Sequence, residues 1–110
     1  MEAMELHCFK IISSVGEAKS AFIEAIRNAR KGNLIQATAL FEAGERKLIE
    51  GHKVHAALLQ NEAAGQKIEL SLLLVHSEDQ LMNAETSKLQ AEEFLYLYRY
   101  LNEGGLLYES

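Results

Sequence analysis

Apolar residues recur along this chain every three to four positions, the spacing of α-helices, in three long segments. The segments run from about Met4 to Lys31, from about Leu34 to Ala64 and from about Ile68 to Asn102. The sequence Lys31-Gly32-Asn33 is typical of a helix end followed by a new N-cap, and Gly65 ends the second segment. At about 1.5 Å per residue each helix reaches roughly 40–50 Å. Short turns between three such helices predict an all-α, antiparallel up-down-up bundle.

Glycines interrupt the predicted helices, and each costs about 1 kcal/mol of helix propensity relative to alanine. Gly44 and Gly51 stand seven residues apart, on one face of the second helix, where they can let another helix approach. Gly16 lies inside the first helix. We expect a close helix crossing there as well.

Length, charge and cysteine content limit the classes of function. We expect one domain over residues 1–103 and a C-terminal tail of residues 104–110. The net charge of −5 argues against nucleic-acid binding and suits a basic protein partner. The only cysteine, Cys8, fits a reducing compartment, and we expect it to be a small buried hydrophobic residue. The longest apolar run is too short to span a bilayer and no signal-peptide pattern precedes it, so we expect a cytoplasmic location.

The third predicted helix has two opposed faces of low charge. One is a core stripe, interrupted by Lys88, that consists of Leu70, Leu73, Leu74, Leu81, Ala84, Ala91 and Leu95. The other is centred on Asp79 and holds, within about 60°, Ile68, Leu72, Val75, His76, Met82, Asn83, Thr86, Gln90, Glu93 and Leu97. A three-helix bundle buries only one of these faces. The second face therefore predicts a homo-oligomer with His76 and Asp79 at or near the subunit interface.

His76 is the first candidate for chemistry, because it ends the apolar run Leu72–Val75. It is either a histidine at the edge of the core that bonds to a neighbour, or a nucleophile whose neutral imidazole attacks phosphorus and carries a phosphoryl group. Asp79, the only aspartate, lies one turn further along. It either bonds to His76 at i, i+3 or meets its symmetry copies around a cation, because an unpaired carboxylate is costly to bury.

His52 and His55 also stand at i, i+3, which can ligate a metal but is equally typical of surface or groove histidines. His7 has no supporting context. A metal-dependent hydrolase could use these two histidines with His76 and Asp79. It would require both His52 and His55 to reach the metal bound by Asp79. The chain has no Gly-rich phosphate loop, no Walker-type lysine motif and no serine–histidine–acid arrangement to argue for. Any phosphoryl group must therefore come from a donor protein.

The chain resembles the lactose/cellobiose-type IIA component of the bacterial phosphoenolpyruvate-dependent sugar phosphotransferase system. The resemblance centres on VHSEDQLMNA, residues 75–84, which is similar to the phosphorylation segment of that family. EGHKVHAALLQNEAAG at residues 50–65 and KGNLIQATALFEAGE at residues 31–45 resemble the segments before it. The similarity extends from about Met4 to Leu101.

This resemblance implies a homotrimer of three-helix subunits. It implies that His76 accepts a phosphoryl group from HPr, the general phosphocarrier, and passes it to a cysteine of the IIB component. The IIB component phosphorylates the sugar as the IIC permease imports it, so membrane contact is indirect. The resemblance also implies one magnesium ion per trimer, held on the threefold axis by copies of Asp79.

Three points stay open in the sequence. Family members often carry glutamine where His55 stands, and either side chain can donate a hydrogen bond to a phosphoryl oxygen. The sugar is undecided among lactose, cellobiose, chitobiose and lichenan-derived β-glucosides. The alternative function is a non-catalytic helical interaction or regulatory module of the same fold.

Overall fold

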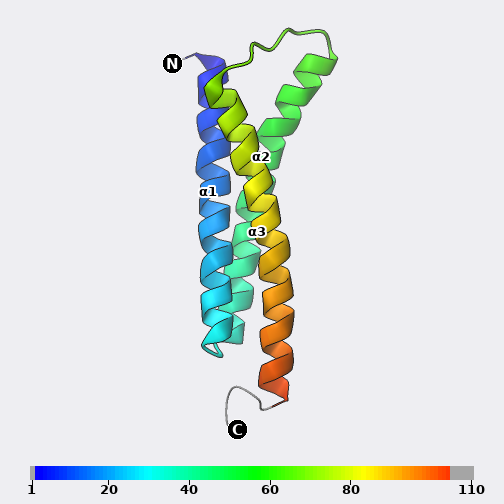
Figure 1. Ribbon diagram of the computed structural model, residues 1–110. Coiled ribbons are helices and arrows are strands. Elements are labelled where there is room, and N and C mark those ends of the chain that lie inside the picture. Colours follow the sequence, from blue (N-terminus) through cyan, green and yellow to red (C-terminus); the bar gives the residue numbers. More distant parts are fainter. Residues whose placement is uncertain (1, 105–110) are drawn as a thin grey trace.

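Residues 2–104 are described by the computed structural model, and this part of the chain forms three long helices (Figure 1). Helix α1 spans Ala3–Arg30, α2 spans Leu34–Ala63 and α3 spans Leu72–Glu103. Each helix runs antiparallel to the one before it, which confirms the predicted up-down-up bundle. The bundle is elongated, with extents of 59 × 24 × 19 Å. Residues 105–110 of the expected tail lie outside the described residues.

The turn between α1 and α2 is held mainly by its backbone. Gly32 has a φ of 87°, in the left-handed region that glycine adopts at little cost, as predicted. Its amide donates to the carbonyl of Ala29 at 3.0 Å, and the amide of Asn33 donates to the carbonyl of Asn28 at 2.9 Å. Asn33 stands at the N-cap of α2, but its side chain makes no capping hydrogen bond.

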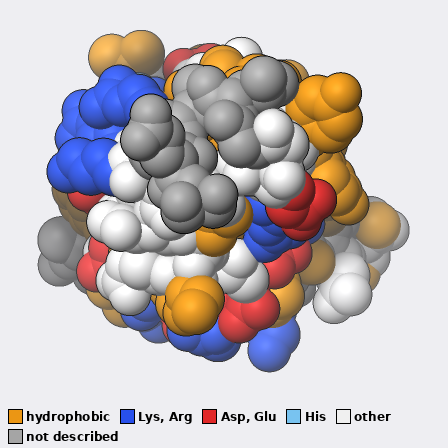
Figure 2. All heavy atoms as spheres, turned by 90° about the horizontal axis from the view of Figure 1, so that it is seen from below, with side chains coloured by type: hydrophobic (Ala, Val, Ile, Leu, Met, Phe, Trp, Pro, Cys, Tyr) orange, Lys and Arg blue, Asp and Glu red, His pale blue; other side chains and the backbone are white. Residues whose placement is uncertain are grey.

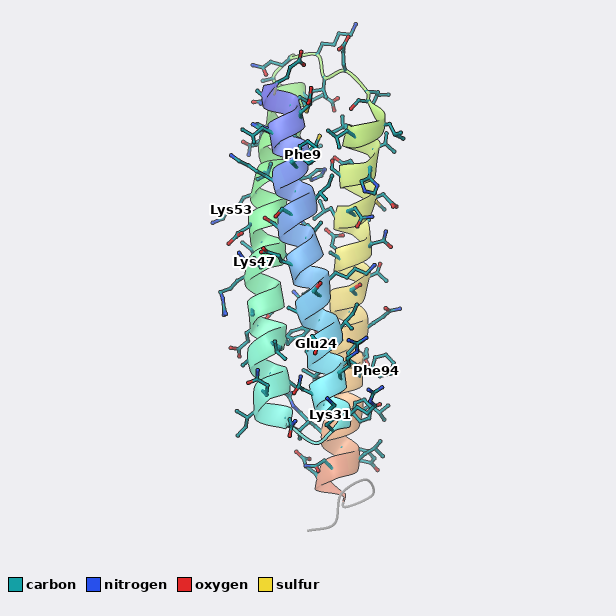
Figure 3. The ribbon with its side chains drawn as sticks, turned by 90° about the vertical axis from the view of Figure 1, so that its left-hand side faces the viewer. Phe9, Glu24, Lys31, Lys47, Lys53 and Phe94 are labelled. Atoms are coloured by element: carbon teal, nitrogen blue, oxygen red, sulfur yellow. The ribbon has the colours of Figure 1, made fainter. Side chains whose placement is uncertain are left out.

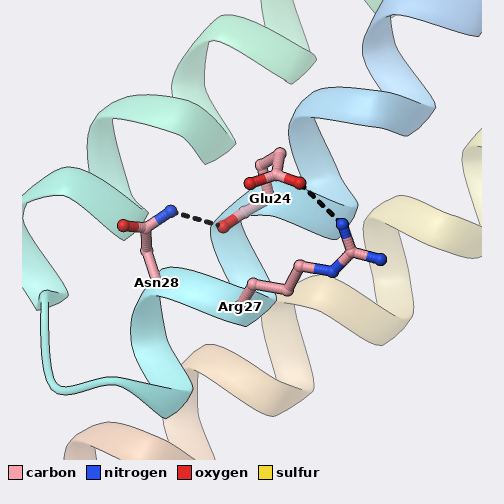
Figure 4. A network of polar contacts seen from close by, with 3 residues as sticks. All are labelled: Glu24, Arg27 and Asn28. Atoms are coloured by element: carbon pink, nitrogen blue, oxygen red, sulfur yellow. Dashed lines mark hydrogen bonds and ion pairs between the residues drawn. The ribbon is translucent and has the colours of Figure 1, made fainter.

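The last turns of α1 are polar on the outer side (Figure 4). Arg27 donates to the Glu24 carboxylate at 2.8 Å, and the Asn28 side chain donates to the Glu24 carbonyl at 2.8 Å. Basic side chains gather on one side of this end of the bundle (Figure 2), and Arg27 and Arg30 occupy the last turn of α1. Positive charge there is favourable, because the C-terminal end of a helix carries partial negative charge.

The connection between α2 and α3 is longer than the predicted short turn. Helix α3 begins at Leu72 rather than near Ile68, so residues 64–71 form the connection. Ser71 explains this later start of α3, because it is the N-cap. Its backbone is extended, and its hydroxyl accepts a hydrogen bond from the Leu74 amide at 3.1 Å. Leu70 therefore lies in the connection and is 85% exposed, so its assignment to the core stripe was wrong. Ile68 packs against the core from the connection instead of lying on the outer face of α3.

The core follows α1, which contacts both other helices. Its buried residues recur at helical spacing and are mostly small or branched: Cys8, Ile11, Val15, Ala18, Phe22, Ala25 and Ala29. The α3 stripe meets them with Leu74, Ser77, Leu81, Ala84, Ala91 and Leu95, which confirms most of the predicted positions. Cys8 is fully buried, as expected. The Ser77 hydroxyl donates to the Leu74 carbonyl at 2.7 Å, so this buried polar group is satisfied.

The glycines of α2 allow the close helix approach that the sequence predicted. A Cβ atom built on Gly44 would lie 2.6 Å from a ring carbon of Phe22, and one on Gly51 would lie 2.6 Å from Cγ1 of Val15. Gly16 of α1 is different, because it is exposed and a Cβ there would meet no atom within 4 Å. The prediction of a close crossing at Gly16 was therefore wrong for a single chain. Helix α1 approaches α2 closely through the face that carries Val15 and Phe22.

Candidate functional site

His76 lies in the second turn of α3, near the end of the bundle that carries the 64–71 connection. Its side chain is exposed, whereas Leu74 and Ser77 on either side of it are buried. These two residues anchor the turn in the core, so the backbone that carries the imidazole is held in place. No hydrogen bond or ion pair involves His76 within residues 2–104, so its ring nitrogens are accessible to a reactant.

Asp79 lies one turn further along the same outer face and is also exposed. Its Oδ2 atom accepts a hydrogen bond from the side chain of Asn83 at 3.3 Å, and the same amide donates to the Asp79 carbonyl at 3.1 Å. Asp79 does not bond to His76 in the described part of the chain. The carboxylate therefore points outward beside the histidine and does not orient it within the chain.

His52 and His55 reach from α2 to α3, where each meets a glutamate. The Nε2 atom of His55 lies 2.6 Å from Oε1 of Glu78, and Nε2 of His52 lies 2.9 Å from Oε1 of Glu85. The His55 side chain is 18% exposed and that of His52 is 47% exposed, so the His55–Glu78 pair is the more enclosed of the two. Sequence reasoning missed both glutamates. The two glutamates stand seven residues apart on α3, opposite the i, i+3 histidine pair of the antiparallel α2. This spacing is the signal that could have identified them.

These placements do not bring the candidate ligands together within one chain. In the described residues, no group of three or more His, Cys, Asp and Glu side chains is placed to hold a metal ion. His52 and His55 face glutamates rather than Asp79, so one chain does not assemble the site that a metal-dependent hydrolase would need. His7 is partly buried, and its Nδ1 atom is enclosed without a hydrogen-bond partner in the described part of the chain.

The outer face of α3 is apolar and uncovered in the single chain. Exposed apolar side chains follow it through its length: Leu72, Val75, Met82, Leu89, Phe94 and Leu97. A groove of about 430 Å³ lies along its C-terminal half, between Leu89, Phe94 and Leu97. Phe94 is at the surface in Figure 3, as is Phe9 on α1. An apolar patch of this length is typical of a protein–protein interface.

The helices formed by residues 2–104 include none with the length and apolar character needed to cross a membrane.

Comparisons with known proteins show which family this chain is similar to. Residues 6–99 match the family model described as "PTS system, Lactose/Cellobiose specific IIA subunit". The lichenan-specific phosphotransferase enzyme IIA component of Bacillus subtilis is 39% identical over 102 residues, which cover 93% of each chain. The lactose-specific EIIA component of Staphylococcus aureus is 34% identical over 98 residues, covering 89% of this chain and 95% of that one.

Solved structures show the same fold. The crystal structure of the cellobiose-specific enzyme IIA from Bacillus anthracis superposes with a TM-score of 0.91 at 37% identity, over 94% of each chain. The family model alone covers far more than half of the sequence, and His76 and Asp79 lie within the matched region. The chain belongs to the lactose/cellobiose-specific IIA subunits of the bacterial sugar phosphotransferase system.

Proposed function

We propose that this chain is a cytoplasmic phosphocarrier in which His76 accepts a phosphoryl group from phosphorylated HPr and passes it to a cysteine of a IIB component. The observation that carries the proposal is the exposed imidazole of His76, which has no partner within the described residues and lies on an anchored turn of α3. Relatives named as IIA components of the phosphotransferase system support it. The transported sugar is proposed to be a β-linked disaccharide.

The transfer needs a nucleophilic nitrogen and little other machinery. A lone pair on one ring nitrogen of His76 attacks phosphorus, the bond to the donor histidine breaks, and its electron pair returns to the donor nitrogen. The second ring nitrogen of His76 keeps its proton. A thiolate of the IIB component then attacks the same phosphorus and releases His76. Phosphohistidine is already activated, so positioning and charge complementarity contribute most of the rate.

The phosphorylation test uses the purified chain with phosphoenolpyruvate, enzyme I and HPr. We expect one phosphate per chain, in an adduct that is labile in acid and stable in base, as a phosphoramidate should be. The His76→Ala chain should accept none, and a His52→Ala chain serves as the control because that histidine faces Glu85 on another side of α3. Phosphate on the His76→Ala chain would contradict the assignment.

We further propose that three copies assemble through the outer faces of α3, because the apolar side chains there are uncovered in one chain. Light scattering coupled to size exclusion should report about three chains per particle. Leu97→Glu places a charge on this exposed apolar face and should yield monomers that remain helical. A monomeric parent chain at micromolar concentration would contradict the proposal.

Magnesium fits Asp79 only in such an assembly. At this position one chain offers the single carboxylate of Asp79, whose hydrogen-bond donor within residues 2–104 is Asn83, whereas magnesium prefers several oxygen ligands. Three copies of Asp79 around the axis would repel one another unless a cation or a proton compensates their charge. A bound cation would stabilise the trimer by mass action.

The test of this metal role is Asp79→Leu. This variant should keep the trimer, melt at the same or a higher temperature than the parent, and lose any sensitivity to a chelator. Dissociation of Asp79→Leu into monomers would show that the carboxylates hold the subunits together in another way.

A further inference from the structure

Ser77 is the one polar residue that is fully buried among residues 2–104, and it directly follows His76. It lies on the core stripe of α3 between Leu74 and Leu81, where helical periodicity predicts an apolar residue. Removing a hydroxyl from water costs free energy unless a hydrogen bond compensates for it. Alanine would fill the same position without that cost, so packing alone does not explain the hydroxyl.

The hydroxyl of Ser77 makes its hydrogen bond within its own helix. It donates to the carbonyl of Leu74, three residues earlier, at 2.7 Å. In an α-helix that carbonyl also accepts from the amide four residues further on, which here belongs to Glu78. A serine hydroxyl that shares a carbonyl in this way often bends the helix and slightly destabilises it. The bond is therefore placed to set the angle between the first two turns of α3 and the rest of the helix.

A second serine holds the other polar group of the same leucine. The Ser71 hydroxyl accepts a hydrogen bond from the Leu74 amide at 3.1 Å, so serine side chains bond to both the N–H and the C=O of Leu74. Leu74 is buried, and His76 follows it by two residues. Side chains in a helix lean toward its N-terminus, so we expect the imidazole of His76 to lie over the turn that these two bonds fix.

We propose that Ser77 is a positioning residue for phosphoryl transfer, because its bond to the Leu74 carbonyl fixes the direction in which α3 presents the imidazole of His76. This inference rests on the proposed function of His76. Attack on phosphorus requires the ring nitrogen to lie at the right distance and angle, and a misplacement of about 1 Å can lower a rate about 100-fold. Ser77 is fully buried, so it cannot touch the donor and acts only through the backbone of its own turn.

The first experiment compares single-turnover phosphoryl transfer from phosphorylated HPr to the parent chain and to Ser77→Ala. We expect the rate constant at saturating donor to fall by about 3- to 30-fold, less than a full 1 Å misplacement would cost, while half-saturation by the donor stays unchanged. The variant should melt at the same or a higher temperature, because alanine is the better helix former. An unchanged rate would overturn the inference. A slow variant that also melts lower would overturn it too, since general loosening would then explain the loss.

Ser77→Thr and Ser77→Val are the matched pair. The two new side chains have nearly the same shape, so any overpacking at this buried position is common to both. Threonine keeps a hydroxyl that can bond to a carbonyl three or four residues earlier, whereas valine has none. Ser77→Thr should therefore transfer faster than Ser77→Val, by a factor similar to that between the parent and Ser77→Ala. Equal rates in the pair would overturn the role of the hydroxyl.

The second experiment separates the position of the imidazole from its intrinsic reactivity. Diethyl pyrocarbonate is a small reagent that acylates exposed imidazoles without a docked donor, and mass spectrometry of the peptide that contains His76 gives the rate at this residue. The parent and Ser77→Ala should react equally, because His76 is exposed in either case. Slowing of this reaction as large as that of phosphoryl transfer would show a less reactive ring and would overturn the positioning role.

The two levels of the argument fail in different ways. A parent chain that accepts no phosphoryl group would overturn the proposed function, and this inference with it. Equal transfer to the parent and to Ser77→Ala would overturn this inference alone and leave the phosphocarrier proposal standing.

Discussion

Two glycine-to-alanine changes provide a direct test of how α1 and α2 pack. At Gly51 the new methyl group would lie 2.6 Å from Cγ1 of Val15, a distance that real Cβ atoms essentially never show. At Gly16 the same methyl group would meet no atom within 4 Å. Both residues lie in helix interiors, so the two variants differ mainly in the space around the added carbon.

The expected magnitudes follow from this difference. Replacing glycine by alanine in a helix interior stabilises it by about 0.5–1 kcal/mol, and this gain is common to both variants. Overpacking a core costs about 1–3 kcal/mol. Val15 is 1% exposed and its branched side chain is stiff in a helix, so it cannot turn away cheaply. Gly16→Ala should therefore stabilise the protein, and Gly51→Ala should be less stable than Gly16→Ala by about 1–3 kcal/mol.

Urea denaturation followed by far-ultraviolet circular dichroism measures both free energies of unfolding. The chain concentration must be the same in all samples, because assembly adds to apparent stability. Equal stability of the two variants would refute the close approach of α1 and α2 at Gly51. Destabilisation by Gly16→Ala would show that another subunit contacts α1 at this position, which is open in the single chain.

Two further predictions concern a helix cap and an ion pair. Ser71→Ala removes the capping hydrogen bond of α3, so it should cost about 1 kcal/mol and speed hydrogen exchange of the first amides of the helix. The hydrogen bond that Lys47 donates to the Glu17 carboxylate raises the pKa of Lys47 in the folded protein. Any stabilisation from this pair is fully present below the unfolded lysine pKa of about 10.4 and is lost as pH rises through the folded value. Lys47→Met should therefore differ from the parent in melting temperature at neutral pH and match it at strongly alkaline pH.

The sequence alone was sufficient to predict the three helices and to distinguish the buried face of α3 from its outer face. Helical periodicity depends on residues three and four apart, so the buried positions from Leu74 to Leu95, except Ser77, could be identified with little knowledge of their partners. The turn at Gly32 was predictable for the same reason, because its left-handed backbone is a local requirement. Periodicity could not locate the start of α3, since the apolar spacing continues through Ile68 while the Ser71 cap ends the connection.

Tertiary structure decided the relations between residues far apart in the chain. Which glycine meets a neighbouring helix depends on the rotation and register of α1 against α2, and these bring Val15 to Gly51 while Gly16 stays open. The same register places His55 against Glu78 rather than beside Asp79. No local pattern contains this information, because it arises when two antiparallel helices settle at the height and angle that best fill the core. The sequence by itself therefore determined that His76 lies on an outward face, whereas only the packed bundle determined which carboxylates surround that face.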